Sequence, residues 1–265
     1  VLTPGLMRWN NMRIIISPAK KMHFDTDSLP YRDLPVFLDQ TRELLGVLNS
    51  MSRGDLKKLW KCNDQIANLN FERLQNMELE RNLTPAILAY EGIQYQYMAP
   101  GVFTDEEFRY IQEHLRILSG FYGLLKPFDG VTPYRLEMQA KLKTGECKDL
   151  YQYWSSKIAG ALFSETNCII NLASKEYGQC VSRYLTTDVR FITCVFGEEK
   201  AGKVIEKGTM CKMARGEMVR YMAENQITNA EDIKTFAGLG YRYASTHSAK
   251  DLFVFLRDTT GGNHD

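Results

Sequence analysis

The stretch LRILSGFYGLLKPFDGVTPYRLEM, residues 115–138, is the most informative part of the 265-residue chain. Within it, Gly120 and Gly123 are separated by two aromatic residues and flanked by apolar segments. A glycine pair in this setting resembles the turn of a helix-hairpin-helix element, where backbone N–H groups approach a DNA phosphate closely. The alternative is a buried strand over residues 116–121 that runs into a turn, because Pro127 would limit a second helix.

Charged residues and a tyrosine gather towards the end of the same stretch: Lys126, Asp129, Tyr134, Arg135 and Glu137. Arg135 is permanently charged and suits a two-pronged contact with a phosphate or another oxyanion. An ion pair between Arg135 and either Asp129 or Glu137 explains the pattern equally well. The segment is therefore a candidate binding site or a structural cluster of ion pairs.

Upstream of this stretch, an apolar run at residues 14–16 predicts a first strand. Ser17 and Lys20 follow it directly, in a turn that Pro18 stiffens. Ligand-binding groups are often placed at strand ends, so both side chains are candidates for a site. The alternative is a plain turn with a solvated lysine.

Downstream, the β-rich run at residues 168–172 is followed by Ser174, a candidate N-cap, and then by Glu176 and Tyr177. The N-terminus of a helix at a strand end is also a ready anion site. These three residues are therefore candidates either for a helix cap or for ligand binding.

A second basic group lies on the helix predicted at residues 213–225. At 100° per residue, Lys212, Arg215 and Arg220 share an arc of roughly 140°. Gly216 lies within that arc and costs about 1 kcal/mol of helix propensity, which predicts that a backbone or a ligand packs closely against it. The alternative is a solvated basic face.

The remaining pattern predicts an α+β fold, a single compact domain whose mixed β-sheet is flanked by helices. Capping boxes at residues 52–55 and 104–107 and an amphipathic run at 35–49 give a helix-rich N-terminal half. Further strands are predicted at 189–196, at 203–212 beyond a turn at 197–202, and as a final pair at 241–243 and 252–255. Without a clean βαβ alternation, this class is favoured over a doubly wound sheet. We expect the domain to span residues 12–258, with 1–11 an appendage and 259–265 a disordered tail.

Composition excludes several classes of protein. Hydrophobic residues are 44% and charged residues 25%, as in ordinary globular proteins. The 33 Lys and Arg against 32 Asp and Glu exclude a strongly basic nucleic-acid binder, although not a local basic patch. No apolar run approaches the ~18 residues of a membrane span, and no leader pattern is present, so we expect a cytoplasmic protein with no membrane partner.

Six cysteines and four histidines show no metal-ligand spacing, so we expect free thiols, no metal and no cofactor.

Six segments resemble the YaaA family of bacterial peroxide-stress-resistance proteins, in the family's order. They are ISPAK at 16–20, LSGFYGLLKPFD with PYRLEM at 118–138, DLYQYW at 149–154, NLASKEY at 171–177, KMARGEMVRY at 212–221 and GYRY at 240–243. The resemblance implies a cytoplasmic protein that limits oxidative damage and is linked to lower free iron. It also implies DNA binding through a helix-hairpin-helix element on a mixed α/β fold. The resemblance does not specify a catalytic reaction.

Two functions follow from these residues. The first is DNA binding through the shape and backbone of the DNA, with little sequence specificity. The turn at 120–123 would donate backbone hydrogen bonds, and Tyr134 and Tyr177 would stack on bases. The phosphates would be contacted by six cations: Lys20, Lys126, Arg135, Lys212, Arg215 and Arg220. The alternative is an enzyme for a small phosphorylated or carboxylated ligand, which would use Ser17, Lys20, Asp129, Tyr134, Arg135, Glu137, Glu176, Lys212 and Arg215. An open groove on the order of 20 Å wide would favour DNA, and a deep pocket would favour the small ligand. Direct iron sequestration is disfavoured because no cluster of ligand residues is apparent.

Overall fold

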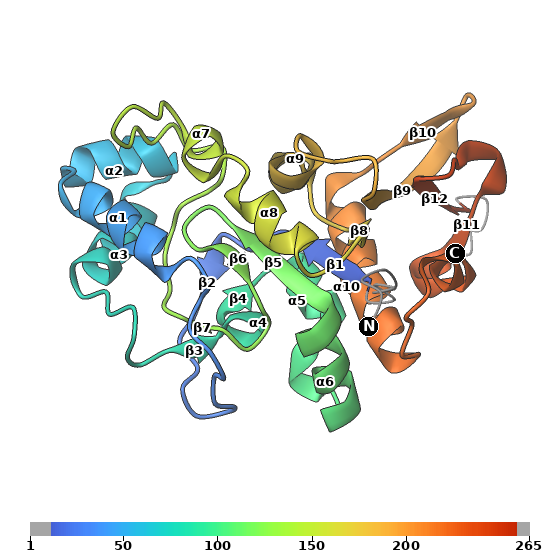
Figure 1. The fold of residues 1–265 in the computed structure, drawn as a ribbon, viewed down its shortest axis with the longest axis horizontal. Helices are drawn as coiled ribbons and strands as arrows, with labels where there is room; N and C mark the ends of the chain where they lie inside the picture. The colour runs from blue at the N-terminus through green and yellow to red at the C-terminus, as the bar shows by residue number, and fades with distance from the viewer. Residues whose placement is uncertain (1–11, 259–265) are drawn as a thin grey trace, which may run out of the picture.

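The computed structural model describes residues 12–258, and they form one domain around an eight-stranded mixed sheet (Figure 1). The strands lie in the order β11-β12-β9-β8-β1-β5-β6, and β10 pairs with β9. Their bounds are β1 Arg13–Ile16, β5 Leu115–Ser119, β6 Gly123–Leu125, β8 Cys168–Asn171, β9 Arg190–Lys200, β10 Lys203–Ile205, β11 Tyr241–Tyr243 and β12 Leu252–Arg257. The prediction of an α+β domain with a mixed sheet is confirmed.

The five central strands are all parallel, and their order decides where a ligand can bind. Strand β1 pairs with β5 on one side and with β8 on the other, and the sheet continues from β8 to β9 and β12. The chain therefore builds outward from β1 to β5 and then returns to the other side of β1. The point of reversal lies between β1 and β8. In open α/β sheets, the crevice at the carboxyl ends of the two strands at such a point is the usual ligand site.

Helices dominate the N-terminal half, as predicted. They are α1 Leu38–Asn49, α2 Arg53–Trp60, α3 Asp64–Gln75, α4 Ala86–Ala89, α5 Ile93–Met98 and α6 Asp105–His114, and the later helices are α7 Leu150–Trp154, α8 Lys157–Phe163, α9 Lys175–Ser182 and α10 Gly208–Glu224. The Ser52 side chain caps α2, and Thr104 forms a complete capping box with Glu107 at the start of α6. Helices α1 to α3 lie together at the end of the molecule opposite β11 and β12 (Figure 1).

Short elements complete the fold. Two small ladders pair β2 Lys21–Met22 with β4 Tyr90–Glu91, and β3 Thr84–Pro85 with β7 Gly130–Val131. Four 3₁₀ turns lie at Pro100–Val102, Ala230–Thr235, Gly238–Gly240 and Ser245–His247. No helix within residues 12–258 combines the length and apolar character needed to cross a membrane.

The glycine turn at residues 120–123 joins two strands, so the helix-hairpin-helix interpretation of this segment is wrong. Strands β5 and β6 pair antiparallel around it, with Ser119 opposite Gly123. The buried-strand alternative is correct because all five residues of β5 are buried and the strand pairs in parallel with β1. Gly123 has a φ of 73°, and a Cβ there would lie 2.8 Å from the Trp154 ring. The glycine therefore serves a tight turn inside the core.

The predicted C-terminal hairpin and the final strand pair are confirmed with shifted bounds. Strand β9 runs on to Lys200 through the segment expected to be the turn, and the chain reverses at Ala201 and Gly202. Both turn residues have positive φ, at 49° and 74°, which suits a two-residue hairpin turn. Helix α10 begins at Gly208, so the strand expected at 203–212 ends at Ile205. The expected appendage at 1–11 and tail at 259–265 lie outside the described residues.

Candidate functional site

A cavity of about 390 Å³ lies where β1 and β8 end, at the reversal point of the sheet. Its wall combines the loops after β1 and β8, the first turn of α9, the segment after β7, helix α5 and one face of α10. Most of the candidate site residues line it: Ser17, Lys20, Tyr134, Arg135, Glu137, Ser174, Glu176, Tyr177, Lys212 and Arg215. Five segments that are far apart in the sequence thus supply one pocket.

Two serines join the ends of β1 and β8. The backbone N–H of Ser174 donates to Ser17 Oγ at 2.8 Å, and Ser17 Oγ donates to Ser174 Oγ at 3.2 Å. Ser174 occupies the N-cap of α9, as predicted, but its side chain makes no capping hydrogen bond. The hydroxyl that accepts a backbone N–H at the start of α9 is therefore that of Ser17.

Glu137 is the centre of an ion-pair group in the pocket. Its Oε2 lies 2.9 Å from Lys20 Nζ, and its Oε1 lies 3.5 Å from Arg135 Nη2. Lys20 is largely exposed, whereas the Arg135 side chain is only 11% exposed. The internal pairing of Arg135 with Glu137 that the sequence allowed is therefore present, and it lies within the pocket.

Helix α10 brings two more cations, and Gly216 explains how closely it approaches. A Cβ on Gly216 would lie closer than 3.0 Å to the carbonyl oxygen of Gln94 in α5. The prediction that a backbone packs against this glycine is confirmed. The contact places Lys212 and Arg215 on the pocket wall, where the nearest carboxylate to Arg215 is Glu206 at 3.8 Å.

Three nitrogen donors on the pocket residues are buried without an acceptor in the described chain. They are Nε2 of Gln94, Nε of Arg135 and Nε of Arg215. Leaving a buried donor unpaired costs about 1–3 kcal/mol, and more for a charged group. Donors and cations that line one cavity are complementary to the oxygens of an anion, although the buried Oε1 of Glu137 in the same lining also lacks a hydrogen bond.

The charges of the lining add to that complementarity. The lining has a net charge of +2, from five cations and three carboxylates: Lys20, Lys21, Arg135, Lys212 and Arg215, and Glu91, Glu137 and Glu176. Glu91 pairs with Lys21 and with His23. Glu176 accepts a hydrogen bond from the Gln139 backbone N–H at 3.1 Å, and burial raises its pKa above the usual range.

The pocket tyrosines belong mainly to the core. Tyr134 Oη bonds with Tyr90 Oη at 2.9 Å and with Ser119 Oγ at 2.6 Å, and burial raises the pKa of Tyr134 to about 12. Tyr177 Oη accepts from the Met138 backbone N–H at 3.4 Å. Tyr134 and Tyr177 are only 7% and 6% exposed, which leaves little ring face for a base to stack on.

Comparison with known proteins identifies the group to which this chain belongs. The family model described as peroxide stress protein YaaA matches residues 12–247. The chain belongs to the YaaA family. Similar proteins named UPF0246 protein come from Agathobacter rectalis and Lachnoclostridium phytofermentans, 56% and 57% identical over 246 residues. Those alignments cover 93% of this chain and 99% and 96% of the relatives.

Within this YaaA-family chain, the structure keeps several candidate residues away from the pocket. Lys126 and Asp129 line a separate cavity of about 170 Å³, where Asp129 Oδ2 accepts from the Lys126 backbone N–H at 2.8 Å. Burial raises the pKa of Asp129 to about 7. Arg220 pairs with Glu224 on the same helix, at 2.7 Å. Gly120 is buried, and a Cβ there would lie 2.5 Å from the Leu136 carbonyl oxygen.

Sequence reasoning missed the contribution of α5, which lines the pocket with Gln94 and Tyr95. Tyr95 Oη donates to the Ser17 carbonyl oxygen at 3.0 Å and so holds the loop after β1. The one available signal was Gly216, which predicted a close neighbour without revealing which segment it was. Among residues 12–258, no group of three or more His, Cys, Asp or Glu side chains could hold a metal ion.

Proposed function

We propose that this member of the peroxide stress family binds a small phosphorylated or carboxylated ligand in the pocket between β1 and β8. The observation that carries the proposal is the set of buried, unpaired donors on Gln94, Arg135 and Arg215 inside a cation-lined cavity. Oxyanion oxygens would satisfy all three donors at once, and the net charge of the lining favours a negative ligand. The place of the cavity at the sheet's reversal point supports the same conclusion.

The size of the cavity supports a small molecule over a duplex. A volume of about 390 Å³ falls in the usual range for small-molecule sites, whereas a duplex needs a groove on the order of 20 Å wide. DNA binding in the cytoplasm remains a second candidate, because Lys20 and Lys21 at the pocket are 65% and 78% exposed. In that case the lysines would contact backbone phosphates while one nucleotide enters the cavity.

Calorimetric titration with sulfate and with adenosine 5′-monophosphate tests the first proposal. Arg215→Ala removes a pocket donor, while Arg220→Ala removes an exposed cation on the same helix that is already paired with Glu224. We expect Arg215→Ala to weaken binding by about tenfold or more, equivalent to about 1.4 kcal/mol, and Arg220→Ala to match the parent protein. Equal effects of the two substitutions, or no binding by the parent, would contradict the proposal.

Substitutions of two pocket cations, Lys20→Ala and Arg215→Ala, test DNA binding. If backbone phosphates contact Lys20 or Arg215, substituting either should reduce the slope of log K against log salt by about 0.7 for a single strand. A short single-stranded oligonucleotide and a duplex of the same sequence are the two probes. Binding of the oligonucleotide without competition from adenosine 5′-monophosphate would assign DNA to a different surface.

A further inference from the structure

The three carboxylates of the pocket differ in how they are neutralised. Glu137 pairs with Lys20 and Arg135, and Glu91 pairs with Lys21. Glu176 forms no ion pair with any residue in the described range 12–258, although it lines the same cavity. A half-buried carboxylate without a cation, in a site built for anions, requires an explanation.

The surroundings of Glu176 offer neutral hydrogen bonds from the backbone of Gln139 and Met138, together with charges of both signs. Gln139 donates its backbone N–H to Oε1 at 3.1 Å, and the nearby cation Lys20 is already bound to Glu137 at 2.9 Å. From α7, Tyr151 Oη donates to the Glu176 backbone carbonyl, which holds the first turn of α9 in place. The titratable groups that face Glu176 are Lys20 and Glu137 across the pocket, Tyr151 on α7, and Tyr177 and Cys180 on α9 itself.

An oxyanion bound by Arg135, Lys212 and Arg215 would share the cavity with this carboxyl group, which lines the same wall. If Glu176 were ionised, the two anions would repel each other inside a partly desolvated cavity. If it carried a proton, its O–H would become one more donor towards the ligand. A buried acid that is kept neutral so that it can donate a hydrogen bond is a known device of enzyme pockets.

Resting on the function proposed above, we propose that Glu176 meets the bound oxyanion as a neutral carboxyl group and donates a hydrogen bond to it, so that ligand binding takes up a proton. Burial, which has the larger effect, and the charge of the nearby Glu137 both raise the pKa of Glu176 in the free protein, and a raised pKa lowers the cost of that protonation. The ligand class narrows accordingly to fully anionic groups such as phosphate monoesters. A ligand with an ammonium group beside its oxyanion would instead pair with ionised Glu176 and take up no proton.

Sulfate is the probe of choice because it keeps the same charge between about pH 5 and about pH 8, so any proton taken up belongs to the protein. We expect the affinity for sulfate to fall as pH rises above the pKa of Glu176 in the free protein, by at most about tenfold per pH unit. Calorimetry in two buffers of different ionisation enthalpy measures the proton uptake directly on the unmodified protein.

Glu176→Gln keeps an oxygen acceptor for the Gln139 N–H and can still donate, so it should bind sulfate with no pH slope and no proton uptake. Glu224→Gln, an exposed carboxylate outside the pocket, should behave like the parent. Proton uptake near zero in the parent, or an unchanged slope in Glu176→Gln, would overturn the inference while leaving anion binding intact. Failure of sulfate to bind at any pH would overturn the proposed function and this inference with it.

Discussion

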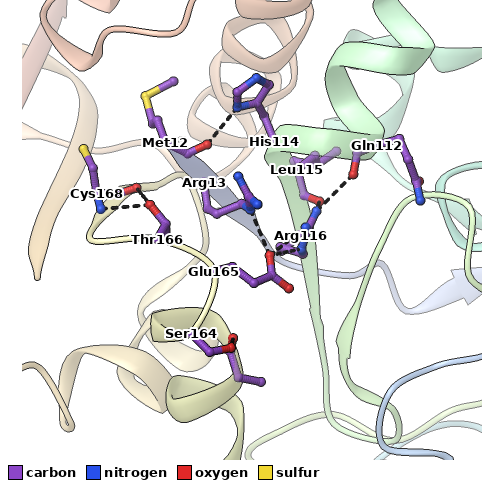
Figure 2. A network of polar contacts seen from close by, with 11 residues as sticks. Met12, Arg13, Gln112, His114, Leu115, Arg116, Ser164, Glu165, Thr166 and Cys168 are labelled. Atoms are coloured by element: carbon purple, nitrogen blue, oxygen red, sulfur yellow. Dashed lines mark hydrogen bonds and ion pairs between the residues drawn. The ribbon is translucent and has the colours of Figure 1, made fainter. Parts of the chain in front are cut away.

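The two ends of the central parallel strands carry the same residue types in different states. At the amino ends, Arg13 Nε and Arg116 Nη2 contact the same oxygen of Glu165, at 2.8 and 2.6 Å (Figure 2). Arg116 Nη1 also donates to the carbonyl oxygens of Leu115 at 2.7 Å and Gln112 at 3.2 Å. The protein itself therefore provides acceptors for most of these donors, and only Arg13 Nη1 in this cluster is buried without one.

At the carboxyl ends, Arg135 and Arg215 each keep a buried Nε without an acceptor, and the contacts to their nearest carboxylates are long, at 3.5 and 3.8 Å. The difference shows that a buried arginine is not by itself a sign of function. Arg116 also lines a cavity, but acceptors of its own chain meet its donors, so we infer a structural role for it. We infer that Arg135 and Arg215, which keep spare donors in the pocket, are available to a ligand. Three sets of substitutions compare the two ends of the strands.

The largest effect should come from Glu165→Ala at the amino ends. The change leaves Arg13 and the buried Arg116 without their shared carboxylate, and breaking a buried ion pair in this way typically costs about 3–5 kcal/mol. Urea denaturation measures the loss, and sulfate titration of the folded fraction should match the parent. A loss below about 1 kcal/mol would mean that this cluster is not structural.

An intermediate effect is expected for Gly216→Ala, which changes the packing behind the pocket. The added Cβ clashes with the backbone of Gln94, and overpacking of this kind costs about 1–3 kcal/mol. Because Gln94 carries one of the unpaired donors, sulfate affinity should fall as well. Gly208→Ala is the matched control on the same helix, since a Cβ there meets no atom within 4 Å. Similar stability of the two variants would show that α10 and α5 can separate freely.

The smallest effect is expected for the two serines that join the ends of β1 and β8. Ser17→Ala removes the acceptor for the Ser174 N–H and should cost about 1 kcal/mol, as for the loss of a helix cap. Ser174→Ala should cost less, because the Ser174 side chain makes no capping hydrogen bond. Thermal unfolding of both variants gives the comparison, and a larger loss for Ser174→Ala would reverse the assignment of the cap.

The features predicted correctly from the sequence depend on residues close together in the chain. The box from Thr104 to Glu107 forms because both reciprocal hydrogen bonds lie within one helical turn. The same local reasoning could not predict the structure around the turn at 120–123, because a glycine pair between apolar segments fits two helices or two strands equally well. Pairing of β5 with β1, about 100 residues away, decided between them.

The residue types available for chemistry can be read directly from the chain: Ser17 and Lys20 after a strand, Arg135 and Glu137 in a rigid segment, and Lys212 and Arg215 on one helix face. Which of these residues meet depends on the folded arrangement. Arg215 and Arg220 share a helix and a charge, yet one lines the cavity and the other pairs with Glu224 in solvent. The pocket forms where β1 and β8 end side by side, and parallel pairing between strands some 150 residues apart leaves no trace in local sequence spacing.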